Sequence, residues 1–141
     1  MNYKFKTTLF FLAIGSIALL SSCKDDEETL VTPEPAAPTI SNVEIGEDNS
    51  MECEPGGDLH LDAEIVAEGK IDKITVDLHP ESGDGDDIEA EYTEYSGLLN
   101  ADFHQDLEIP STTEHGEYHF HMTVTDQAGK STSIEADVHI H

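Results

Sequence analysis

The chain has 141 residues, and its 31 acidic residues face six lysines and no arginine, which gives a formal net charge of −25 with histidine neutral. Such a charge repels nucleic acid and anionic membrane surfaces, so we exclude both as electrostatic partners and expect the protein to attract cations. Eight histidines supply side chains that bind such cations.

The first 22 residues are predicted to be a bacterial secretion signal. Two lysines precede an apolar stretch over residues 9–20, which is too short to be a transmembrane helix. Residues 20–23 read LSSC and resemble the lipobox of bacterial lipoproteins. The resemblance implies that Cys23 is diacylated, becomes the first residue of the mature chain and anchors it in a membrane. A plain signal peptide that happens to contain Cys23 is the alternative.

Residues 23–38 are predicted to form an acidic, proline-rich tether. The run KDDEE at residues 24–28 resembles the surface-export signal of Bacteroidota-type lipoproteins, and a solvated spacer is the alternative. Pro33, Pro35 and Pro38 favour an extended and fairly stiff segment. These features predict a lipid-anchored protein of the outer membrane that is exposed at the cell surface.

Residues 39–141 are predicted to form one domain of ordinary size. Alternation of apolar and polar residues with period two predicts β-strands over residues 39–46, 58–66, 72–79, 102–109, 117–125 and 133–141. Pro80 is expected to end the third of these strands. We expect residues 81–89 to be a loop and residues 92–99 to hold a short edge strand. If Cys23 is acylated, Cys53 has no disulfide partner within the chain. We expect a half-buried thiol at a strand end, and an intermolecular disulfide is the alternative.

About seven short strands separated by turns predict an all-β fold, an antiparallel β-sandwich. The sequences GEY at residues 116–118 and VTDQAG at residues 124–129 resemble the F strand and F–G turn of bacterial immunoglobulin-like domains. The resemblance implies an immunoglobulin-like sandwich with a tyrosine corner at Tyr118. With the lipobox and the tether, the chain resembles Bacteroidota-type surface lipoproteins of unknown function, a likeness that implies fold and location but no activity.

The polar faces of the last two predicted strands carry a row of histidines. His119 and His121 open one strand, and His139 and His141 close the other. Each pair projects from one face because alternate residues of a strand share a face. In an immunoglobulin-like topology the strand that ends at His79 lies beside them, so we expect five outward-facing histidines at one end of one sheet.

The register of this hairpin stays open by one step of two residues. If Thr125 faces Ser131, His119 lies opposite Asp137, whereas in the other register His119 lies opposite His139. Directly paired Cβ atoms lie about 4.5–5.5 Å apart. Either register therefore allows two or three imidazoles to reach one metal ion at about 2.0–2.1 Å per nitrogen.

The predicted metal ligands are five histidines and one carboxylate: His79, His119, His121, His139, His141 and Asp137. Imidazole with carboxylate suits Zn(II), Cu(II) or Ni(II), and no thiolate is expected nearby. A second, weaker site is expected on the opposite sheet, where His60 and His104 face outward near acidic residues, namely Asp62, Glu64 and Asp106.

These observations predict a lipid-anchored extracytoplasmic module that binds a divalent transition metal, buffers it or supports its uptake, and hands it to an outer-membrane transporter. The alternative is a structural or adhesive surface module whose histidines are incidental or respond to pH. We do not predict an enzyme or any catalytic residue. An open sheet face offers metal ligands without an evident pocket, and no serine or cysteine nucleophile constellation is present.

Overall fold

The computed structural model describes residues 32–83 and 85–141. The predicted signal peptide, Cys23 and the first part of the tether lie outside the described residues. Residues 33–141 form one compact unit. Its elements in chain order are β1 (Thr39–Ile45), the short 3-10 turn η1 (Glu47–Asn49), β2 (Glu52–Cys53), β3 (Asp58–Val66), β4 (Ile71–Pro80), β5 (Ile88–Tyr92), β6 (Asn100–Glu108), β7 (Gly116–Asp126) and β8 (Ser131–Ile140). Within the described ranges, no helix has the length and apolar character needed to cross a membrane.

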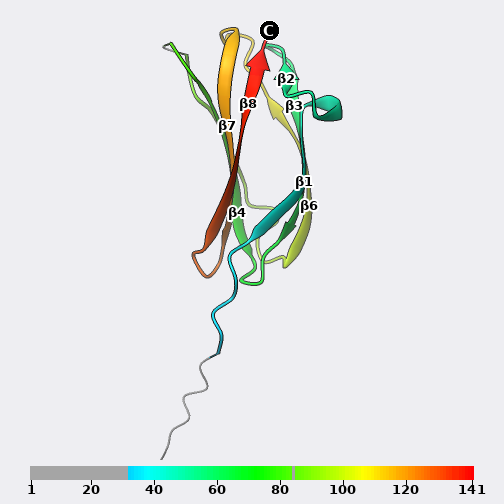
Figure 1. Ribbon diagram of the computed structural model, residues 1–141, viewed down its shortest axis with the longest axis vertical. Helices are drawn as coiled ribbons and strands as arrows, with labels where there is room; N and C mark the ends of the chain where they lie inside the picture. The colour runs from blue at the N-terminus through cyan, green and yellow to red at the C-terminus, as the bar shows by residue number, and fades with distance from the viewer. Residues whose placement is uncertain (1–31, 84) are drawn as a thin grey trace, which may run out of the picture. The chain divides into compact units, whose positions relative to one another are not determined.

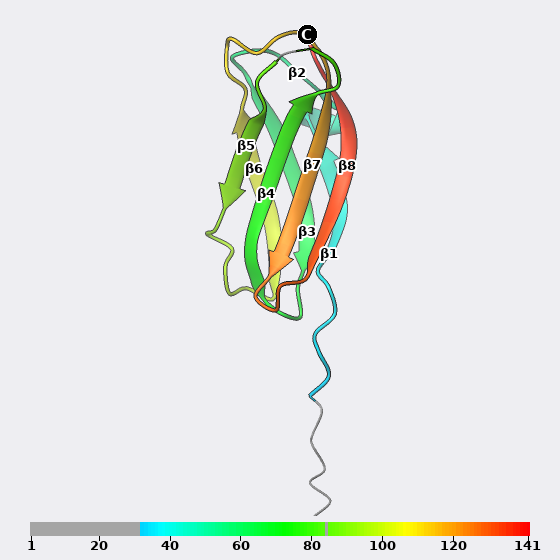
Figure 2. The same ribbon diagram turned by 90° about the vertical axis from the view of Figure 1, so that its left-hand side faces the viewer.

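The strands form two sheets that pack face to face, which confirms the predicted immunoglobulin-like β-sandwich (Figure 1). One sheet has the order β1-β3-β6 and the other the order β2-β8-β7-β4-β5. Figure 2 shows β5, β4, β7 and β8 side by side in front of the smaller sheet. Neighbouring strands are antiparallel except β2 and β8, which run parallel with Cys53 beside Ile140. Between β1 and β3, which both belong to the smaller sheet, the chain thus crosses to the larger sheet to form β2 and then returns.

The core lies between the sheets and is built from the apolar positions of the alternating strands. The fully buried members from β3 and β7 show the pattern most clearly: Leu59, Leu61, Ala63, Ile65, Tyr118, Phe120, Met122 and Val124. Each large apolar side chain buried in this way contributes about 1.5–3 kcal/mol relative to exposure. On β8, Ile134 and Ala136 are only partly buried, whereas Val138 and Ile140 are fully enclosed. The polar positions of the same strands consequently face solvent.

The prediction is wrong between strands β4 and β6. The fifth strand covers Ile88–Tyr92, part of which was expected to be loop, and the chain turns where an edge strand was expected. Within this turn Ser96 N–H donates to Thr93 O at 3.0 Å, and Gly97 adopts a positive φ of 85°. The strand forms because Ile88, Ala90 and Tyr92 face the core, a signal hidden by the acidic residues around it.

Most other boundaries agree within two residues, and β3 matches its predicted range. The two-residue strand β2 was not predicted, which brings the strands in the described residues to eight. Pro80 is the last residue of β4, as expected. The tyrosine corner is also present, because the buried Tyr118 donates its hydroxyl hydrogen to Glu114 O at 3.0 Å.

Cys53 is a free cysteine in the structure and lies in the core. Its side chain is 7% exposed, so it is more deeply buried than the predicted half-buried thiol. Loss of hydration in the core raises the pKa of the Cys53 thiol to about 11. The thiol is therefore protonated near neutral pH and is a poor metal ligand, since metals bind the thiolate.

Candidate metal centre

The outward side of the five-stranded sheet carries a continuous polar surface on β4, β7 and β8, here called the histidine face. It comprises Asp77, His79, Glu117, His119, His121, Glu135, Asp137 and His139. On β4 and β7, His79 is paired with His119, and Asp77 with His121. Directly paired residues of a sheet share a face, so the antiparallel register gathers these side chains on one side.

Three imidazoles of the histidine face contact one another. The ring centroids of His119 and His121 lie 4.8 Å apart, those of His79 and His121 5.3 Å, and those of His79 and His119 5.7 Å. The side chain of His79 is 37% exposed, that of His119 35% and that of His121 29%. Each ring is therefore partly buried and still open to solvent. Two strands far apart in sequence therefore supply one group of three nitrogen donors.

Carboxylates hold the Nδ1 atoms of two of these rings. His119 Nδ1 lies 2.9 Å from Asp137 Oδ1, and His79 Nδ1 lies 3.0 Å from Asp77 Oδ2. An ionised carboxylate only accepts hydrogen bonds, so the imidazole Nδ1–H is the donor. A neutral ring then keeps its lone pair on Nε2, which is the arrangement found around metal-ligating histidines. Asp137 and Asp77 thus hold His119 and His79 with Nε2 as the nitrogen that carries the lone pair of a neutral ring.

The observed register is the first of the two alternatives. Thr125 pairs with Ser131, so His119 faces Asp137 and not His139. His79, His119 and His139 lie on the same side of one sheet, as the hypothesis of a shared patch requires.

The five predicted histidines divide into two groups. His139 is hydrogen-bonded through Nδ1 to Glu117 at 2.8 Å, and its ring stacks on His141 at a centroid distance of 5.4 Å. The structure thus gathers the rings of His79, His119 and His121, with Asp137 bonded to His119, and leaves His139 and His141 as a neighbouring pair.

Glu81 is a candidate ligand outside the set predicted from sequence, because residues 81–89 were expected to form a loop. One ligand atom each from Glu81, His119 and Asp137 lies within 4.8 Å of the others. The backbone explains this position, because Glu81 N–H donates to Glu117 O at 2.9 Å and extends the β4–β7 ladder beyond Pro80. The sequence does contain a signal for this position, because Glu81 directly follows Pro80, the residue at which β4 ends.

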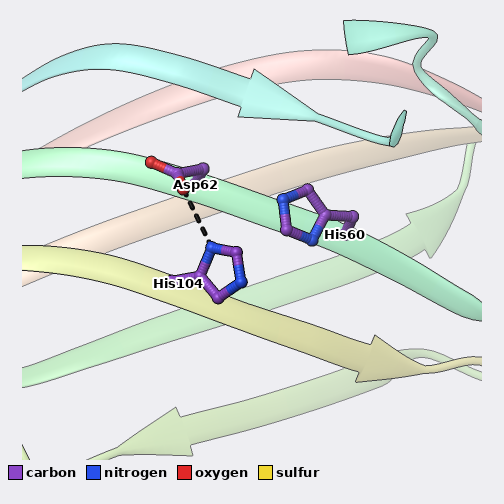
Figure 3. A group of neighbouring side chains, drawn as sticks. All are labelled: His60, Asp62 and His104. Carbon is purple, nitrogen blue, oxygen red and sulfur yellow. Dashed lines mark hydrogen bonds and ion pairs between the residues drawn. The ribbon is translucent and has the colours of Figure 1, made fainter. Parts of the chain in front are cut away.

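A second group of histidines and carboxylates lies on the outward side of the smaller sheet, and we call it the β3–β6 cluster. It comprises His60, Asp62, His104 and Asp106. His60, Asp62 and His104 each place a ligand atom within 4.8 Å of the others (Figure 3). The hydrogen bond between His60 and Asp106 is the main cause that raises the pKa of His60 above its usual value. The sequence predicts a weaker site here, with Asp62, Glu64 and Asp106 as its carboxylates.

Comparison with solved structures supports the fold assignment. A Niemann-Pick type C2 protein from Japanese carpenter ant aligns with a TM-score of 0.53 and 6% identity, over 77% of this chain and 96% of that one. This likeness shows a shared β-sandwich and nothing beyond the fold. Spo0M, a sporulation control protein from Bacillus subtilis, aligns with a TM-score of 0.46 and 12% identity, over 75% of this chain and 50% of that one.

Comparison with protein families gives a match over nearly the whole chain, whereas comparison with curated proteins finds no match. The matching family model is described as a domain of unknown function and covers residues 21–141. The chain therefore belongs to the DUF4625 family.

Proposed function

We propose that this protein is a lipid-anchored extracytoplasmic module that binds a divalent transition metal, Zn(II), Cu(II) or Ni(II), through the histidine face. The observation that carries the proposal is the contact among the imidazoles of His79, His119 and His121, beside the carboxylate of Asp137. Imidazole and carboxylate ligands together suit these three metals.

Coordination by all three imidazoles requires their side chains to rotate, because among the described residues these rings are not one of the groups whose ligand atoms lie within 4.8 Å of one another. A bound ion takes imidazole nitrogens at about 2.0–2.1 Å, which places two such nitrogens roughly 3–3.5 Å apart in a tetrahedral site. Ring centroids at 4.8–5.7 Å are compatible with this spacing when the Nε2 atoms turn toward one another. Asp137 and Glu81 then either occupy a remaining coordination position or hold a ligating ring by its Nδ1–H.

Charge favours metal capture from dilute solution. Removal of the signal leaves four lysines against 31 acidic residues, a net charge of −27. Beside the histidines, a hollow of ≈ 500 Å³ over β4 and β5 is walled in part by Asp77, Glu89 and Glu91. Acidic side chains around an open site raise the local concentration of cations and speed their association.

The anchor and the location follow from the N-terminal sequence and belong to the same proposal. Diacylation at Cys23 would hold the domain at the outer membrane, and the acidic run at residues 24–28 favours export to the cell surface in the manner of Bacteroidota-type lipoproteins. The tether then gives the domain reach above the membrane. A module in this place buffers metal ions or passes them to an outer-membrane transporter.

Calorimetric titration of the untagged chain from Lys24 to His141 with Zn(II) and Cu(II) tests the metal site. We expect binding tighter than about 100 μM and a clear loss of affinity in the double variant H79A/H119A. The matched control is H115A, because His115 is an exposed histidine in the loop before β7 and lies outside both groups. Binding that is absent, or unchanged by H79A/H119A, would contradict the proposal.

The second candidate is a structural or adhesive surface module whose histidines respond to pH. The observation that favours it is that carboxylates pair with the histidines of both sheets, including His60 with Asp106 and His139 with Glu117. Such pairs gain an ionic interaction when the ring is protonated. Capture of a protein or glycan partner in the presence of a chelator, with binding that changes between pH 5 and pH 8, would favour this function.

A further inference from the structure

We infer that the β3–β6 cluster is a second metal site, separate from the histidine face, in which His60, His104 and Asp62 bind a divalent transition metal. This inference does not depend on metal binding at the histidine face, because the two sets of ligands share no residue.

The register of β3 and β6 builds this site. His60 lies directly opposite Asp106, and Asp62 lies directly opposite His104, so the four side chains alternate on the outward face. The two imidazoles are diagonal neighbours with ring centroids 4.7 Å apart and planes inclined by 70°. Figure 3 shows both rings and the Asp62 carboxylate gathered over the two strands.

Hydrogen bonds hold both rings without occupying all of their nitrogens. His60 Nδ1 lies 2.9 Å from Asp106 Oδ1, and His104 Nδ1 lies 2.9 Å from Asp62 Oδ2. Asp106 accepts the Nδ1–H of His60, so this ring offers its Nε2 lone pair to an ion. The metal ligands are then one nitrogen from each ring and a carboxylate oxygen of Asp62, and water completes the coordination. Asp106 acts as a positioning residue.

Exposure differs between the two rings in a way that suits an ion held at the surface. The side chain of His60 is 24% exposed and that of His104 is 67% exposed. His60 is thus the more enclosed of the two ligands, and His104 is the more open to solvent. Two imidazoles and one carboxylate suit Zn(II), Cu(II) and Ni(II), the same metals as the histidine face.

The approach to His60 is acidic from two sides. One hollow of ≈ 310 Å³ is lined by His60 with Glu44, Glu47 and Asp48. Another, of ≈ 280 Å³, contains His60 together with His141 and several carboxylates, namely Glu47, Glu52, Glu54 and Asp58. These walls favour cations over anions and neutral ligands at this position. They also place the C-terminal His141 near His60.

The two sites cannot share one ion. They occupy the outward faces of opposite sheets, and stacked sheets lie about 10 Å apart with the apolar core between them. The expected stoichiometry of the chain is therefore two ions, and each site is removed by substitutions in its own sheet.

Equilibrium dialysis against Zn(II) or Ni(II), with metal content measured per chain, tests the inference on the untagged chain from Lys24 to His141, which contains the whole compact unit. We expect two ions in the wild type, one in H60A/H104A, one in H79A/H119A and two in the control H115A. Asp106→Asn should keep the β3–β6 site but weaken it by about 10–100-fold, as expected for a residue that orients a ligand.

The outcomes separate the two sites. One ion that H79A/H119A removes and H60A/H104A leaves in place would overturn this inference and retain the proposed function. One ion that H60A/H104A removes and H79A/H119A leaves in place would support this inference and contradict metal binding at the histidine face. A measurement on the wild type avoids dependence on folding of the variants, because Cu(II) added up to two equivalents per chain should broaden the ring resonances of His60 and His104. Ring resonances of His60 and His104 that stay sharp would overturn the inference.

Discussion

His79 and His119 lie directly opposite each other on neighbouring strands, with ring centroids 5.7 Å apart. They are 40 positions apart in the sequence, and the β4–β7 register alone brings their imidazoles to the same side. His79 Nδ1 is hydrogen-bonded to Asp77, which lies on the same strand, and His119 Nδ1 is hydrogen-bonded to Asp137 on β8. This relationship places two imidazoles of the histidine face side by side.

Metal binding should stabilise the folded state. A ligand that binds only the folded chain adds about 2.7 kcal/mol when its free concentration is 100 times the dissociation constant. We expect Zn(II) to raise the melting temperature of the wild type measured by circular dichroism, and to raise that of H79A/H119A less. The control H115A should respond as the wild type does. Equal shifts in all three proteins would mean that the histidine face contributes nothing.

The titration of His60 should depend on Asp106. The hydrogen bond from His60 to Asp106 raises the ring's pKa above 6.5, so the folded state favours the protonated ring. This contribution to stability is fully present below pH 6.5 and is lost as the pH rises through the pKa of the folded state.

NMR titration of the His60 ring in metal-free protein measures this effect. We expect Asp106→Asn to lower the pKa of His60, whereas Asp102→Asn, which removes an exposed carboxylate of the same strand that is not bonded to His60, should change it less. A pKa that is the same in the wild type and in Asp106→Asn would show that the 2.9 Å contact has no energetic consequence.

Asp126 should be important for stability because it closes the β7–β8 hairpin from a buried position. Its side chain is 1% exposed, and its Oδ1 accepts a hydrogen bond from Lys130 N–H at 2.8 Å. Asp126→Ala leaves this N–H without its partner, which costs about 1–3 kcal/mol. Asp126→Asn keeps an acceptor oxygen and should cost less.

Urea denaturation of both Asp126 variants gives the free energies of unfolding. The exposed Asp102→Ala serves as control and should stay within about 0.5 kcal/mol of the wild type. Gly69→Ala is expected to destabilise the fold as well, because a Cβ there would overlap the carboxylate of Asp126. A chain in which Asp126→Ala is as stable as Asp102→Ala would refute the importance of this turn.

The contribution of the tyrosine corner to stability can be tested by removing one atom, the hydroxyl oxygen of Tyr118. Tyr118→Phe removes the hydroxyl that donates to Glu114 O at 3.0 Å and leaves the buried ring in place. The expected loss is about 0.5–1.5 kcal/mol in the free energy of unfolding, with metal affinity unchanged. The same denaturation experiment measures it, and a stability equal to that of the wild type would show that water replaces this hydrogen bond.

Local pattern was sufficient to predict the strands that carry the candidate sites. In β3, β7 and β8 the apolar residues alternate with polar ones, and the side chains of a strand point to opposite faces in turn. The outward direction of His60, His119 and His139 therefore follows from sequence alone. The F–G turn sequence, read with Tyr118, also indicated the immunoglobulin-like sandwich.

Long-range pairing was decided only in the tertiary structure. Whether His119 faces Asp137 or His139 depends on the turn that follows Asp126, where Gly129 N–H donates to Asp126 O and Asp126 N–H donates to Lys130 O. The strand β5 was missed because its short apolar alternation gains stability only from packing on the core. The contacts of His79 with His119 and of His60 with His104 likewise arise from the register between strands far apart in sequence, and no local pattern specifies that register.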